Sequence, residues 1–167
     1  SGGGNSGAVY IGTNTAKGGR GGAVYVTVGS GDTGTGGDIR LVAGETGDDT
    51  SGGDVYIQTG VSSGESSASS GDLSMTTPNA GTAGVSGQIT MSTGTSSDGA
   101  TGAIEIGSGA ATNGKGGSVY VTVGAGDSGV GGELVLSAGK STGGNSGALY
   151  MGTDASSAES GSVYVTV

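Results

Sequence analysis

Short stretches in which apolar and polar residues alternate recur along the whole chain. Residues 24–28 read VYVTV, for example, and residues 55–59 read VYIQT. Apolar residues at every second position are typical of an extended strand with one apolar side, whereas a helix would show a period near 3.6. We call these stretches the segments. Their first apolar residues are Val9, Val24, Ile39, Val55, Leu73, Ile89, Ile104, Val119, Leu134, Leu149 and Val163.

The segments follow one another at steps of 14 to 18 residues, which is typical of a repeat architecture. A slower period of about 46 residues is superimposed, because every third segment is alike. The first kind includes 9–13 and 55–59, the second 24–28 and 119–123, and the third 39–43. The likeness extends into the loops, since GAVYVTVGSGDTGTGGD at 22–38 returns as GSVYVTVGAGDSGVGGE at 117–133.

Each segment has two sides of different character. The apolar side, such as Val24, Val26 and Val28, holds only apolar or small residues, and the opposite polar side holds residues such as Thr27 and Arg40. All six tyrosines lie on the polar side, directly after the first apolar residue. We expect them to face solvent or to form lateral contacts between fibres, because aromatic residues are enriched in interface cores. They are Tyr10, Tyr25, Tyr56, Tyr120, Tyr150 and Tyr164.

These periods predict an all-β fold, a parallel β-solenoid (β-helix) with three faces, about 15 residues per face and about 46 per turn. Like segments would then stack at about 4.8 Å. A solenoid with one segment per turn is the alternative. We expect one repetitive region over 1–167, part of a longer array because solenoids need caps at open ends. Gly-rich loops of roughly nine residues would use glycine for positive φ angles.

The composition excludes several classes of site. Gly, Ser and Thr make up more than half of the chain, and Cys, His, Trp and Phe are absent. No His- or Cys-dependent nucleophile, zinc site or thiolate-held cluster can therefore form, and we expect neither an enzyme nor a cofactor. The net charge of −9 argues against a nucleic-acid or anionic-membrane partner. No membrane span is expected.

Two more specific kinds of binding stay open as alternatives. Calcium would use oxygen ligands in Gly-rich turns, and the carboxylates to consider are Asp32, Asp127, Asp48, Asp49 and Asp54. We assign no metal ligand, because the position equivalent to Asp32 one superperiod later is Gly81. Ice binding would use a Thr column on one solenoid face, made of Thr27, Thr76, Thr122 and Thr166.

The words SGAVYIGT, GGAVYVTVGSGDTGTGGD, LVAGET and SGGDVYIQTG resemble the Gly/Ser/Thr-rich repeats of very large secreted or cell-surface proteins of algae and other protists. The resemblance covers the chain and implies an extracellular or cell-surface setting and a long repetitive parent, without an activity. We therefore expect a structural protein, the shaft of an extracellular fibre or cell-surface appendage, that self-associates axially or laterally. The alternative is an ice-binding or adhesive β-solenoid, with or without calcium. O-linked glycans would fall on Ser62 to Ser70.

Overall fold

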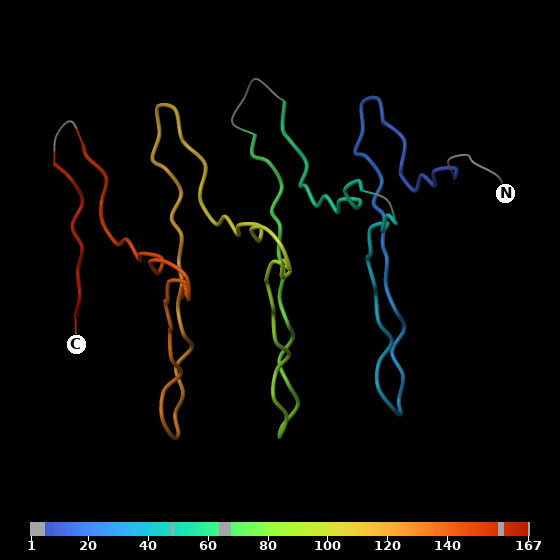
Figure 1. Ribbon diagram of the computed structural model, residues 1–167. Helices are drawn as coiled ribbons and strands as arrows, with labels where there is room; N and C mark the ends of the chain where they lie inside the picture. Colours follow the sequence, from blue (N-terminus) through green and yellow to red (C-terminus); the bar gives the residue numbers. More distant parts are fainter. Residues whose placement is uncertain (1–5, 48, 64–67, 157–158, 167) are drawn as a thin grey trace. The chain divides into compact units, whose positions relative to one another are not determined.

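The computed structural model describes residues 6–47, 49–63, 68–156 and 159–166. Over these residues the backbone forms neither a helix nor a β-strand, and Figure 1 draws neither coiled ribbons nor arrows. The prediction of an all-β parallel β-solenoid, with three segments or with one per turn, is therefore wrong for the described part of the chain. The terms β-solenoid and β-helix do not apply to it.

The reason lies in the backbone hydrogen bonds. Those between described residues lie within single loops, as from Gly53 N to Gly44 O (2.9 Å) and from Gly147 N to Gly139 O (2.9 Å). A strand requires a ladder with a neighbour about 4.8 Å away. Alternation decides which side a residue occupies, but it does not bring a second segment within that distance.

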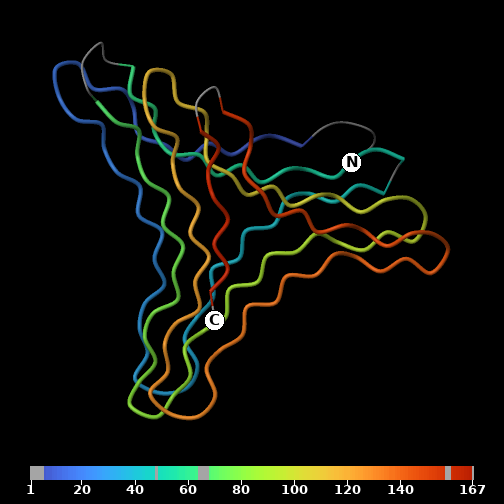
Figure 2. The same cartoon turned by 90° about the vertical axis from the view of Figure 1, so that its left-hand side faces the viewer.

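The chain divides into two units, Ser1–Ile89 and Thr90–Val167. The expectation of one repetitive region over 1–167 stays a prediction. Each unit taken by itself consists of extended stretches connected by narrow loops (Figure 2). The segments correspond to the extended stretches. The positive φ angles expected for the loops occur at Gly18 (71°) and Gly34 (78°) in the first unit. In the second unit they occur at Gly99 and Gly129, and at Asn113, which stands where the first unit has Gly18.

Neither unit has a hydrophobic core in its described residues. None of these residues is buried, and most are exposed, the first apolar residues of the segments included. The solvent-accessible surface of 16756 Å² is more than twice the roughly 7,100 Å² expected for a compact protein of this mass. The apolar sides of the segments are therefore open to solvent.

A glycine lies two residues before the first apolar residue of every segment, and we call these residues the corner glycines. From the second segment onward they are Gly22, Gly37, Gly53, Gly71, Gly87, Gly102, Gly117, Gly132, Gly147 and Gly161. None of them has a positive φ. At each, an added Cβ would lie 2.7 to 3.7 Å from an atom at the end of the preceding segment or just after it. The corner glycines therefore allow the two ends of each loop to approach closely.

The position of the corner glycines fixes which sides face each other. Gly37 lies on the apolar side of its segment, two residues before Ile39, and Val28 ends the apolar side of the segment before. A Cβ at Gly37 would lie 2.7 Å from Val28 Cγ1. Because residues i and i+2 share a side in an extended chain, the apolar sides of these two segments meet where Val28 and Gly37 close the loop, and the rest of each side stays exposed.

Three kinds of contact close the loops. After the first-kind segments at 9–13 and 104–108 a hydroxyl donates to the corner glycine carbonyl, from Thr13 Oγ1 to Gly22 O (3.2 Å) and from Ser108 Oγ to Gly117 O (2.9 Å). After the first-kind segment at 55–59 the backbone N–H of Gly71 donates to Gly60 O (3.0 Å) instead. After the second-kind segments at 24–28 and 119–123 a valine methyl group lies next to the position that a Cβ of the corner glycine would take, Val28 at Gly37 and Val123 at Gly132. After the third-kind segments at 39–43 and 134–138 the backbone bond between the loop ends closes the loop, as at Gly53. Equivalent positions of the two units thus repeat the same local geometry.

Candidate interaction surface

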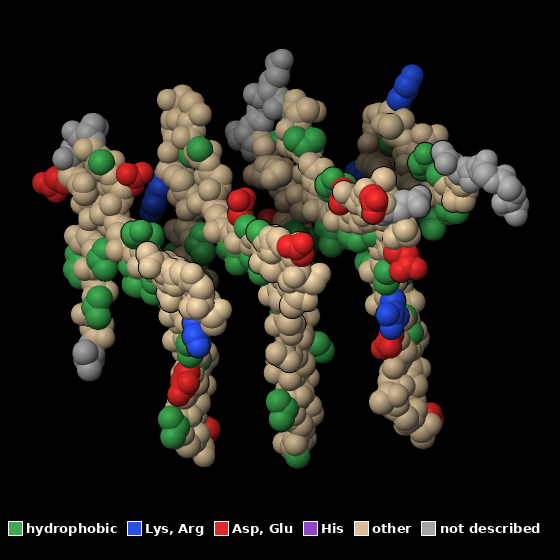
Figure 3. Space-filling model, in the orientation of Figure 1, with side chains coloured by type: hydrophobic (Ala, Val, Ile, Leu, Met, Phe, Trp, Pro, Cys, Tyr) green, Lys and Arg blue, Asp and Glu red, His purple; other side chains and the backbone are tan. Residues whose placement is uncertain are grey.

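The apolar sides of the segments form the first candidate surface for interaction. In the segment at 24–28, Val26 is 72% exposed, while Val28, next to the corner, is 48% exposed. The corners therefore shelter the ends of a segment and leave its middle open. Figure 3 shows hydrophobic side chains at the surface, interspersed with uncharged atoms. No charged residue occupies the apolar side of any segment, so covering this surface would bury no charge.

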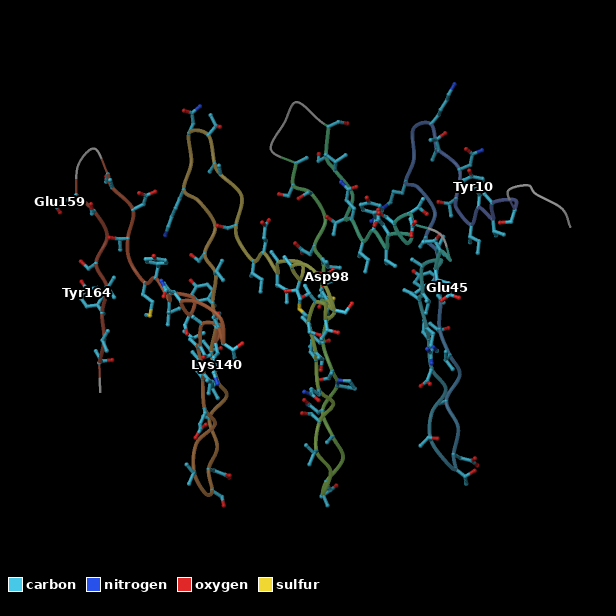
Figure 4. All side chains as sticks on the ribbon, in the orientation of Figure 1. Tyr10, Glu45, Asp98, Lys140, Glu159 and Tyr164 are labelled. Carbon is cyan, nitrogen blue, oxygen red and sulfur yellow. The ribbon has the colours of Figure 1, made fainter. Side chains whose placement is uncertain are left out.

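The tyrosines form the second candidate surface, on the polar sides. All six are 85% to 93% exposed, and each is more exposed than the first apolar residue beside it. Figure 4 labels Tyr10 in the first unit and Tyr164 in the second, each drawn beside the backbone of its own unit. Their lateral contacts stay a prediction.

One tyrosine differs from the others in its hydrogen bonding. The hydroxyl of Tyr56 donates to Asp54 Oδ2 at 3.1 Å. The two residues are two positions apart in an extended stretch, so both side chains lie on the polar side. Asp54 was considered above as a calcium ligand, and its carboxylate is engaged here with a phenol.

The other predicted acidic residues are not brought together. Asp32 and Asp127 occupy equivalent loops in different units, and both are exposed. Across the described ranges no three carboxylates cluster in a way that would hold a metal ion. Asp48 lies outside the described residues, next to the exposed Asp49. The structure therefore adds no support to the calcium alternative.

The described residues form no pocket. None of their backbone forms a helix that is long and apolar enough to cross a membrane. The Thr column of the ice-binding alternative was expected on a solenoid face, and the described residues do not form that face. Within the proposed glycan region Ser62 to Ser70, residues 64–67 lie outside the described chain.

The corner glycines are the positions that the sequence reasoning missed. It assigned the loop glycines to positive φ angles, whereas the corner glycines serve close approach. The signal was present, because glycine occurs two residues before the first apolar residue of every segment, from Gly7 to Gly161. A residue without a Cβ at a fixed point of an alternating pattern indicates close contact with another part of the backbone or with a side chain.

Comparisons with known proteins give no match. No protein-family model matches the chain, and neither does any curated protein or solved structure.

Replacing Tyr25, Tyr120 and Tyr164 with serine is expected to weaken lateral association about fivefold. An aromatic pair contributes about 0.5 to 1.5 kcal/mol beyond its buried area, and the apolar sides stay intact. Bundling of particles in electron micrographs and light scattering would measure the effect. The matched control changes Thr27, Thr122 and Thr166 to serine in the same segments. Equal bundling of both variants would contradict the tyrosine contact.

Proposed function

We propose that this chain is a structural segment of an extracellular fibre or cell-surface appendage, and that its copies associate through the apolar sides of the segments. The observation that carries the proposal is that every segment has an uncharged apolar side, while no described residue is buried. A chain that repeats an apolar surface without burying it gains stability when another copy covers that surface.

The area available supports this role. The surface exceeds that of a compact protein of the same mass by roughly 9,600 Å², while a standard interface buries about 1,600 Å² in total. Covering a valine or isoleucine fully contributes about 1.5 to 3 kcal/mol. Because the segments repeat along the chain, one copy offers the same surface many times, and this favours extended assemblies over a single closed pair.

The charge of the chain opposes association and makes it depend on salt. Each copy carries a net charge of −9, so copies repel one another at low ionic strength. The apolar sides themselves carry no charge, so the repulsion acts between loops and polar sides that stay in water. Salt screens such exposed charges, because the Debye length falls from about 30 Å at 0.01 M to about 10 Å at 0.1 M.

The extracellular placement rests on the resemblance of the repeat words at 6–13 and 21–38 to those of large surface proteins. A mechanical role also fits the composition, because the chain has no residues for acid–base chemistry by imidazole or for nucleophilic attack by a thiol. The many Gly, Ser and Thr residues suit a long repetitive chain with tight loops.

Sedimentation velocity over a range of chain concentrations tests the proposal. We expect the mean mass of the particles to rise with chain concentration. When the salt is increased from about 0.01 M to about 0.1 M, this rise should begin at a lower chain concentration. Electron microscopy of the associated material should show particles much longer than a single chain. A chain that stays monomeric at every concentration and salt level would contradict the proposed function.

A further inference from the structure

The hydrogen bond between Tyr56 and Asp54 singles out one tyrosine of the six. Tyr56 is 86% exposed, and its hydroxyl donates to Asp54 Oδ2 at 3.1 Å. The other tyrosines have no carboxylate two residues before them. Those positions hold Ala8, Ala23, Ser118, Ala148 and Ser162. Tyr56 is therefore the only one of the six with a carboxylate two residues before it, on the same side of the extended chain.

This pairing matters for the oxidation of a phenol. When a phenol loses an electron it also releases its proton, and a positioned carboxylate that takes the proton acts as a general base. The chain contains no Trp or Cys that could compete for the oxidising equivalent by one-electron transfer. The phenols are thus its main one-electron donors, and Tyr56 is the one whose proton already has an acceptor.

We propose that Tyr56, paired with Asp54, is the preferred site of oxidative tyrosine cross-linking between copies of this chain, with hydrogen peroxide as oxidant and a haem peroxidase as catalyst. The linking step rests on the proposed function, because association holds many copies together and so raises the local concentration of the phenols on their exposed polar sides. The selectivity for Tyr56 does not rest on it, because the selectivity follows from the hydrogen bond between Tyr56 and Asp54 of the same chain.

Two phenols each lose one electron to the peroxidase and one proton, which Asp54 accepts from Tyr56 and passes to water. The two phenoxyl radicals join through a new carbon–carbon bond at the ring positions next to the oxygens. The hydrogens of those two carbons then return to the oxygens, restoring both phenols. In sum two ring C–H bonds are lost, one C–C bond forms, and hydrogen peroxide is reduced to two waters.

The first measurement is the share of oxidation at each tyrosine. The chain is treated with horseradish peroxidase and hydrogen peroxide in the presence of a radical trap, and the trapped sites are mapped by mass spectrometry. We expect Tyr56 to carry more than half of the label. Asp54→Asn should lower labelling at Tyr56 about tenfold, because an amide does not accept the proton. Tyr56→Phe should remove that label and leave the other sites unchanged.

A variant that is expected to gain labelling tests the inference without relying on a loss of label. Ala148→Asp places a carboxylate two residues before Tyr150, in a segment of the same kind as that of Tyr56. Labelling at Tyr150 should rise several-fold in this variant. A label spread evenly over the six tyrosines, or unaffected by Asp54→Asn and Ala148→Asp, would overturn the inference.

Cross-linking without the trap separates the two proposals. Covalent dimers and their dityrosine fluorescence are measured on the full chain, next to sedimentation of the same sample before oxidation. Association without preferential linkage at Tyr56 overturns this inference and leaves the proposed function standing. Preferential labelling of Tyr56 in a chain that stays monomeric supports the selectivity of the site and contradicts the proposed function.

Discussion

A chain in which Val26 and Val121 are both replaced with lysine is expected to lose at least about a hundredfold in its association constant. Both valines lie in the middle of the apolar side of their segments, where they are 72% and 65% exposed. Loss of each valine contact removes about 1.5 kcal/mol or more from the free energy of association, and every 1.4 kcal/mol is a factor of ten in the association constant. Covering the new ammonium groups adds a desolvation cost. Sedimentation velocity at fixed salt measures the change.

The matched control places the same two charges on the polar side of the same segments. Thr27→Lys with Thr122→Lys alters the net charge equally and changes the position next to each valine. We expect this variant to associate as well as the unchanged chain or better, because its net charge is less negative. If both lysine pairs weaken association equally, charge and not the apolar side governs it, and the proposed contact surface is wrong.

Replacing Gly37 and Gly132 with alanine is expected to open two corners and to lower association more than about tenfold. A Cβ would lie 2.7 Å from Val28 Cγ1 at the first glycine and 2.7 Å from Val123 Cγ1 at the second. Valine is stiff about χ1, so its methyl group cannot move aside at low cost. Overpacking typically lowers the stability of the folded corner by about 1 to 3 kcal/mol per site. This exceeds the stabilisation of about 0.4 to 1 kcal/mol that alanine contributes by restricting the unfolded chain.

The neighbouring glycines provide the control for this pair. Gly36→Ala and Gly131→Ala restrict the unfolded chain in the same way, and a Cβ at either position meets nothing within 4 Å. This variant should associate normally, and its loop at 29–36 should resist limited proteolysis as the unchanged chain does. Faster cleavage in the Gly37 and Gly132 variant alone would show an opened corner. Identical behaviour of both variants would mean that the corners do not orient the apolar sides for association.

The repeat and the two sides of each segment could be read from the sequence because both are local properties. Residues such as Val24, Val26 and Val28 share a side in any extended chain, whatever lies beside it. For the same reason the sequence places Tyr25 on the opposite side, and the tyrosines are exposed in the structure. The lateral contact of the tyrosines is not a local property, because it depends on a second molecule.

The solenoid could not be derived in this way. Its prediction assumed that like segments, such as 9–13 and 55–59, stack at ladder spacing because they are alike in sequence. Similar sequence gives similar local geometry, as the equivalent contacts at Val28 and Val123 illustrate. It does not specify the distance between two segments, which depends on the balance of contacts between residues far apart in the chain.

The sequence by itself thus determined the spacing of the segments, their uncharged apolar sides, and the position of a glycine before each of them. Only the tertiary structure decided that the described backbone forms no ladder, and that the corner glycines serve the close approach of two loop ends. The physical reason is that side-chain alternation follows from the geometry of one extended chain, whereas hydrogen-bonded ladders and contacts below 4 Å require separate parts of the chain to meet.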